Sequence, residues 1–154
     1  MDHKDRVDTN ANVRVDDYAF EGLLAQCRKI EEQFERSDGD IADIDRAKIE
    51  LERAVDSKEE RRISGDVDKI YASLKRKLDS LKVELEEMKL MSEGDQTGMD
   101  DTERGIVSTK VAAYYVELKN KLTTASASYS AYKNAAKGRL VKQVKNIDAN
   151  NQLD

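Results

Sequence analysis

The residues that most often carry out chemistry are scarce in this chain. His3 is the only histidine and Cys27 the only cysteine, and they lie far apart in the sequence. A Ser-His or Cys-His catalytic pair, or a metal site built on these residue types, needs several of them together. The 32 Asp and Glu residues are scattered, which is typical of a solvated charged surface rather than of paired catalytic carboxylates. We therefore expect a binding protein and not an enzyme, with no metal, no cofactor and no internal disulfide.

The composition indicates long helices exposed to water. The chain has 154 residues, enough for one domain, with no proline, 38% charged residues and 5% aromatic residues. The net charge of −5 argues against nucleic-acid binding, which needs an excess of clustered Lys and Arg. No apolar run approaches the roughly 20 residues that span a bilayer, and residues 1–15 do not form a signal peptide. We expect this chain to be soluble and cytosolic.

Apolar residues recur at steps of three and four, which predicts helices at about 17–56, 58–92 and 99–147. The first stripe crosses Gly39 without losing phase, so we expect one continuous helix there with a weak point at the glycine. Ser57 followed by Glu60 fits a capping box at the start of the second helix. The segment Glu93–Gly98, rich in Gly, Asp, Gln and Thr, has the chemistry of a loop.

The three stripes define the expected core. The first consists of Phe20, Leu23, Cys27, Ile30, Phe34, Ser37, Ile41, Ile44, Lys48, Leu51 and Val55. The second consists of Ile63, Val67, Ile70, Leu74, Leu78, Leu81, Leu85, Met88 and Met91. The third consists of Val107, Val111, Tyr114, Leu118, Leu122, Ala125, Tyr129, Tyr132, Ala136, Leu140, Val144 and Ile147.

Each helix must bury its stripe against the others, and short connections make consecutive helices antiparallel. The sequence therefore predicts an all-α, antiparallel up-down-up three-helix bundle over residues 16–148, with left-handed packing like that of a coiled coil. We expect residues 1–15 to form a flexible tail and residues 149–154 to be a frayed end.

The third predicted helix carries a more specific pattern, in which a tyrosine and several basic residues stand at fixed positions. The pattern is met by Tyr132, Lys133, Lys137, Arg139, Leu140, Lys142 and Gln143. With three long heptad helices after a polar tail, it resembles the amino-terminal regulatory Habc domain of syntaxins (Qa-SNAREs, or t-SNAREs) over about residues 17–147. The chain departs from the family at Ala125 and Tyr129, which leaves the subfamily and its membrane open.

The resemblance implies a regulatory domain in vesicle docking and membrane fusion. In syntaxins this domain can bind the protein's own SNARE helix, or a Sec1/Munc18-type protein, and so control assembly with partner SNAREs. By this resemblance we expect the chain to be a fragment that ends just after the third helix. A linker, a SNARE motif and a membrane anchor would follow, and the full-length protein would lie on the cytosolic face of an intracellular or plasma membrane.

The family's groove is formed by the second and third helices, and four residues beside the core stripes are candidates for its edges. They are Tyr71, Tyr115, Lys119 and Ser126. Because neighbouring residues lie ~100° apart on a helix, Tyr114 and Tyr115 cannot both point inward. The alternative for Tyr71 and Tyr115 is that they cover the core, with packed rings and wet hydroxyls.

Two charged segments leave alternatives open. Asp5 and Arg6 match part of a short amino-terminal peptide by which some syntaxins bind Sec1/Munc18 proteins; the alternative is an inert polar tail. The basic residues of the third helix could complement a helix dipole, form a solvated face or contact anionic lipid. They are Lys133, Lys137, Arg139, Lys142 and Lys145.

Two other classes of helical protein fit less well. A spectrin-like scaffold or adaptor module usually has tryptophan in its core and recurs as repeats, whereas this chain has no tryptophan and no internal repeat. A membrane-curving helical dimer needs a strongly basic concave face, which an acidic chain does not favour.

Overall fold

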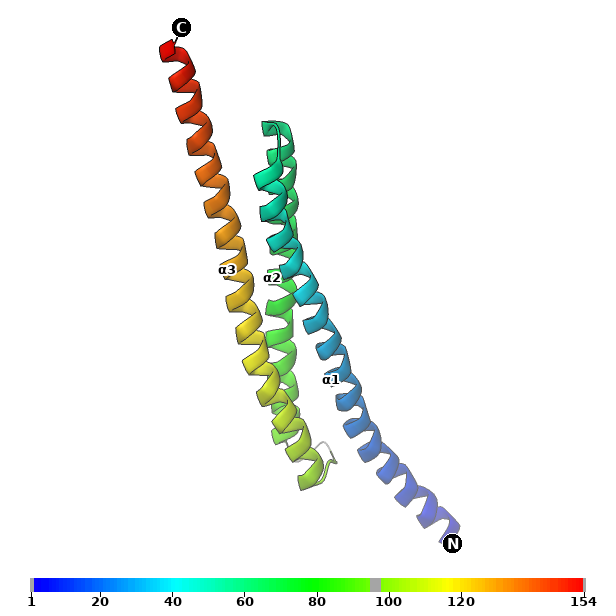
Figure 1. The fold of residues 1–154 in the computed structure, drawn as a ribbon. Coiled ribbons are helices and arrows are strands. Elements are labelled where there is room, and N and C mark those ends of the chain that lie inside the picture. Colours follow the sequence, from blue (N-terminus) through cyan, green and yellow to red (C-terminus); the bar gives the residue numbers. More distant parts are fainter. Residues whose placement is uncertain (1, 95–97, 154) are drawn as a thin grey trace. The chain divides into compact units, whose positions relative to one another are not determined.

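The computed structural model consists of three long α-helices (Figure 1). It describes the backbone of residues 2–94 and 98–153 and the side chains of residues 19–94 and 98–139. The helices are α1 (Asp2–Arg53), α2 (Ser57–Glu93) and α3 (Asp101–Leu153), and the described residues contain no strand. The predicted all-α three-helix bundle is confirmed. Among the described residues, no helix is long and apolar enough to cross a membrane.

The chain divides into two compact units, each of which takes a segment from all three helices. The first unit consists of residues 1–35 with 77–120, and the second unit of residues 36–76 with 121–154.

Contacts within the second unit fix the directions of its helices. Lys121 contacts Asp38 within α1, and Arg139 contacts Ala54 just beyond the end of α1, so α1 and α3 run in the same direction. α2 begins beside that end, with Glu60 against Arg139, and returns antiparallel to both. The up-down-up order is therefore the predicted one, and the left-handed sense of the packing stays a prediction.

Most stripe residues with described side chains are buried. Val55 and Met91 are exposed, and the half-buried ones are Phe20, Lys48, Ile70, Leu122, Tyr129 and Ala136. Near the end of α1, Ala47 and Ala54 are buried in place of the predicted Lys48 and Val55; Val55 is 87% exposed. Steps of three and four both keep the stripe in phase, so spacing cannot choose between neighbouring positions. The structure buries the small apolar residue and leaves the ammonium of Lys48 closer to water, because burying a charge is costly. Near the end of α2, Ser92 is likewise buried and Met91 exposed.

The helix caps differ from the predicted ones. Asp56, not Ser57, caps α2: its carboxylate accepts a hydrogen bond from the Glu59 N–H at 2.8 Å. At the start of α3, Asp100 accepts from the Glu103 N–H at 2.7 Å and donates its own N–H to the Glu103 carboxylate at 3.1 Å. This reciprocal pair is a capping box.

The outer limits of the helices also differ from the predicted ones. α1 begins at Asp2 and so includes residues of the predicted tail, and α3 continues to Leu153 rather than 147. Neither terminal segment contains glycine or proline, the residues that most readily end a helix. The flexibility of the tail stays a prediction. α1 runs through Gly39 without a break, as predicted. Gly98, in the connection between α2 and α3, has a φ of 75°, a conformation that favours glycine.

Candidate functional site

In the first unit, the predicted groove residue Tyr115 lies on the side of α3 that faces α2. Its ring is half-buried. Burial raises the pKa of the Tyr115 hydroxyl, and the carboxylates of Glu86 and Glu93 on α2 raise it further. Lys119, one turn further along α3, is exposed. Tyr115 thus stands at the α2–α3 boundary of this unit.

Large apolar residues are exposed close to Tyr115 in sequence and on the neighbouring helix. Val116 of α3 is 62% exposed, and Val83 and Leu90 of α2 are 55% and 70% exposed. Val83 and Leu90 are seven residues apart and lie on one side of α2, about 140–160° around the helix from buried Leu85. The core does not use these side chains. Sequence reasoning missed them, although an apolar residue out of phase with its stripe is the signal that identifies them.

Elsewhere in the first unit, the buried polar groups are satisfied within the fold. The Tyr114 hydroxyl donates to the Glu31 carboxylate at 2.7 Å, and its ring centroid lies 6.0 Å from that of Phe34. Burial raises the pKa of the Cys27 thiol, which disfavours the reactive thiolate. No group of three His, Cys, Asp or Glu residues that could hold a metal ion occurs among the described residues.

In the second unit, the predicted groove residue Tyr71 belongs to a cluster that joins α2 to α3. The ring of Tyr71 stacks on that of Tyr129, with centroids 4.0 Å apart and planes at 6°. The Tyr129 hydroxyl donates to Asp68 at 2.7 Å, and the Lys133 Nζ lies 3.1 Å from the same carboxylate oxygen and 5.2 Å from the Tyr129 ring centroid. We call these four residues the tyrosine cluster. Tyr71 covers the helix interface here, as the core-covering alternative expects, and Ser126 is exposed.

The charges of the tyrosine cluster stabilise one another. The hydrogen bond from Tyr129 lowers the pKa of the Asp68 carboxyl, and Lys133 lowers it further. The hydrogen bond to Asp68 in turn raises the pKa of the Lys133 ammonium. Both groups are therefore charged at neutral pH. The cluster holds α2 and α3 together, and its carboxylate and ammonium are already paired with each other.

Tyr132, the first residue of the family pattern, is a core residue. Its side chain is fully buried, and its hydroxyl lies 2.7 Å from the Ser64 hydroxyl of α2. Burial raises the pKa of the Tyr132 phenol. The hydrogen bond satisfies the one polar atom of an otherwise apolar side chain.

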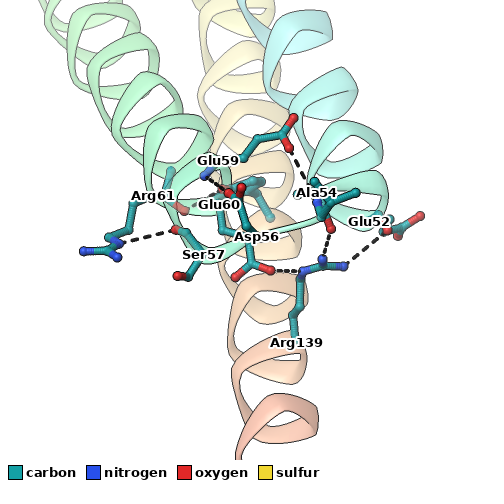
Figure 2. A network of polar contacts seen from close by, with 11 residues as sticks. Glu52, Ala54, Asp56, Ser57, Glu59, Glu60, Arg61 and Arg139 are labelled. Atoms are coloured by element: carbon teal, nitrogen blue, oxygen red, sulfur yellow. Dashed lines mark hydrogen bonds and ion pairs between the residues drawn. The ribbon is translucent and has the colours of Figure 1, made fainter.

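Arg139 joins all three helices at the connection between α1 and α2 (Figure 2). Its guanidinium donates to the Glu60 carboxylate of α2 and to the backbone carbonyls of Glu52, at 3.2 Å, and Ala54. The last carbonyls of a helix have no partner within the helix, and the planar fork of arginine can reach several acceptors at once. Of the alternatives for the basic cluster, Arg139 does meet helix-end carbonyls, but they are those of α1.

Lys137 is exposed. The side chains of Leu140, Lys142, Lys145 and Gln143 lie outside the described residues, as do those of Asp5 and Arg6, whose backbone belongs to α1. The structure brings Tyr132, Lys133 and Arg139 into contacts between helices. It describes Tyr115 and Lys119 in one unit and Tyr71 and Ser126 in the other.

Comparison of the chain with family models, with curated proteins and with solved structures gave no match. The resemblance to syntaxins therefore rests on the length of the three helices and on the pattern between Tyr132 and Gln143.

Proposed function

We propose that this chain is the regulatory domain of a syntaxin-like t-SNARE, which controls SNARE complex assembly in vesicle docking and membrane fusion. The observation that carries the proposal is the Tyr132–Gln143 pattern on the third helix of a three-helix bundle. In the full-length protein the domain would lie on the cytosolic face of a membrane, and only a carboxyl-terminal anchor would enter the bilayer.

The exposed apolar residues of the first unit support a helical partner. Val83 and Leu90 are one heptad apart on α2, and Val116 is exposed beside half-buried Tyr115 on α3. An amphipathic helix recognises such a surface by apolar side chains at positions i, i+3, i+4 and i+7. The chain's own SNARE motif is the partner we propose, in competition with partner SNAREs. A difference of a few kcal/mol between the bound and free states is enough for such a switch.

The contacts of the second unit indicate that residues of the family pattern stabilise the bundle and do not bind the partner. Tyr132, Lys133 and Arg139 are engaged with α1 or α2 and hold the bundle together. We therefore assign them to the scaffold and assign SNARE binding to the exposed side chains of the first unit. Tyr71 takes part in the stack on Tyr129 within the second unit and, in this proposal, does not carry the binding energy.

The test is titration of the 15N-labelled chain with a syntaxin SNARE-motif peptide. We expect shift changes at Val83, Leu90, Tyr115 and Val116, and a Kd raised about tenfold by the double substitution Val83→Ser and Leu90→Ser, because the loss of two apolar contacts costs on the order of 1–3 kcal/mol. The control is Ile49→Ser, which removes an apolar side chain of similar exposure, 49%, from α1. Unchanged shifts at both Tyr115 and Tyr71 would overturn the groove assignment.

The amino-terminal peptide is tested separately, with a Sec1/Munc18-type protein. If Asp5 and Arg6 act as in the syntaxins that carry such a peptide, the substitutions Asp5→Ala and Arg6→Ala will weaken capture of that protein by the immobilised chain. Capture that is equal with and without these substitutions assigns residues 1–15 to an inert tail.

A further inference from the structure

The segment of α3 in the second unit has few large side chains in the core. Among residues 121–139 of α3, Tyr132 is the only large side chain that is fully buried, and Ala125 is the other buried residue. Leu122 and Tyr129 are only half-buried. Apolar burial therefore makes a small contribution to the docking of this segment.

Ion pairs make up much of the contact instead. Lys121 pairs with Asp38 of α1, and Lys133 pairs with Asp68 of α2, where both side chains are more than 40% exposed. Arg139 pairs with Glu60 at the α1–α2 connection. Only the Lys133–Asp68 pair is largely exposed on both sides; Lys121 is 15% exposed, and Arg139 and Glu60 are 27% and 17% exposed. Pairs that water reaches are individually weak and are screened by salt.

The distribution of charges in the sequence agrees with attachment of this segment by ion pairs. Between Glu117 and Asp148, α3 contains seven basic residues and no acidic residue. The acids that meet them lie on α1 and α2. This segment of α3 is thus a basic helix set on a hairpin that supplies the carboxylates.

The α1–α2 hairpin supplies most of the large buried side chains described in the second unit. They are Ile41, Ile44 and Leu51 from α1 and Ile63, Val67 and Leu74 from α2. Hollows lie both between α1 and α3, about 430 Å³ beside Gly138 and Arg139, and between α1 and α2, about 330 Å³ beside Ile63. The hairpin thus holds six large buried side chains, whereas residues 121–139 of α3 supply one.

We infer that residues 121–139 of α3 form a releasable segment, which the three ion pairs fasten to the α1–α2 hairpin and which undocks before the hairpin opens. Released, the segment loses its tertiary support, from which most helical stability in proteins comes. Release uncovers the side of the hairpin that α3 covers, where Asp38, Glu60 and Asp68 border buried apolar residues. The inference does not depend on the proposed relation to syntaxins.

Amide hydrogen exchange of the whole chain tests the inference. Between 0.05 and 1 M NaCl we expect protection in residues 121–139 to fall about tenfold, and protection in residues 105–118 to change less than about twofold, since salt at 1 M screens charges beyond roughly 3 Å. Equal protection and an equal salt response in the two segments would mean that α3 opens as one piece, and would overturn the inference.

Substitutions that each remove a lysine charge show which ion pairs hold the segment. Lys121→Gln and Lys133→Gln together should lower protection in residues 121–139 at low salt and abolish most of the salt response. Lys137→Gln removes the same charge from an exposed residue of the same segment and should change neither. If Lys137→Gln has the same effect as the double substitution, net charge and not the ion pairs controls release, and the inference is wrong.

Discussion

The two segments of α3 are attached to the other helices in different ways. In the first unit, α3 buries four large side chains, those of Val107, Val111, Tyr114 and Leu118. Over residues 121–139 of the second unit it buries one, that of Tyr132, and relies on ion pairs and hydrogen bonds. Full burial of a large apolar side chain contributes about 1.5–3 kcal/mol, whereas an exposed ion pair contributes about 0.2–1 kcal/mol. One amphipathic helix can thus be firmly packed over one segment and loosely fastened over the next.

The test with the largest expected effect removes the one large core side chain of α3 among residues 121–139. Tyr132→Ala should destabilise the fold by about 3–5 kcal/mol, because it leaves a cavity where a fully buried ring stood. Urea unfolding measures the loss, and amide exchange should place it in residues 121–139. Leu118→Ala is the matched change in the first unit, where three other buried side chains still hold α3. Equal loss of protection in both segments for both variants would contradict the contrast.

Removal of the Arg139 guanidinium should have the next largest effect. Arg139→Met keeps much of the side-chain length but loses the bonds to Glu60 and to the carbonyls of Glu52 and Ala54, so we expect a loss of about 1–3 kcal/mol. Arg139→Lys should recover only part of it, because an ammonium lacks the planar fork. Urea midpoints of the three proteins check this order. A Lys variant as stable as the original chain would show that charge alone suffices.

A smaller change should strengthen the loosely fastened segment. Gly138 lies within α3, and a Cβ at this position would meet no atom within 4 Å. Gly138→Ala should therefore stabilise the helix by about 0.5–1 kcal/mol and raise protection in residues 121–139. The control is Gly105→Ala in the first unit, where a Cβ would also meet no atom within 4 Å. This control should leave protection in residues 121–139 unchanged. A loss of stability on Gly138→Ala would contradict the open space seen there.

The smallest expected effect is a pH dependence of the second unit. The pKa of Asp68 is lowered by folding, so its contribution is fully present above its ordinary value of 3.8 and is lost as the pH falls through the folded pKa. The pKa of Lys133 is raised, so its contribution is lost as the pH rises through a value above 10.5. Exchange in residues 121–139, compared at each pH with unfolded peptides, should show weaker protection at both extremes.

The control for the pH dependence is a pair of Asp→Asn variants of α2. Asp68→Asn should remove the loss of protection in residues 121–139 at low pH (the acid limb). Asp66→Asn should retain it, because Asp66 pairs with Arg62 of its own helix instead of with α3. Retention of the acid limb in Asp68→Asn would show that the tyrosine cluster does not fasten the segment.

Sequence alone gave a good account of the helices and a poor account of their ends. The steps of three and four found the buried positions because only one face of a helix can be covered by its neighbours. They could not distinguish Ala54 from Val55, since both keep the phase and the choice depends on how closely α2 approaches. Nor could they distinguish Asp56 from Ser57 as the cap, because both residue types favour that position.

The candidate site was predictable only in part. Tyr115 could be placed at the α2–α3 boundary from its position beside the Tyr114 core residue. The stack of Tyr71 on Tyr129 could not be predicted from the sequence, because it joins residues 58 positions apart and depends on the register of two antiparallel helices. The same holds for Arg139, whose acceptors lie on the other two helices.

The sequence by itself determined that the chain is helical and that three stripes form its core. These properties follow from local spacing and from composition, which no packing can change. Only the tertiary structure decided which side chains of α3 serve the core, which fasten it by charge and which stay exposed. Those outcomes depend on the neighbours that a side chain meets across the bundle, and the spacing within one helix does not contain that information.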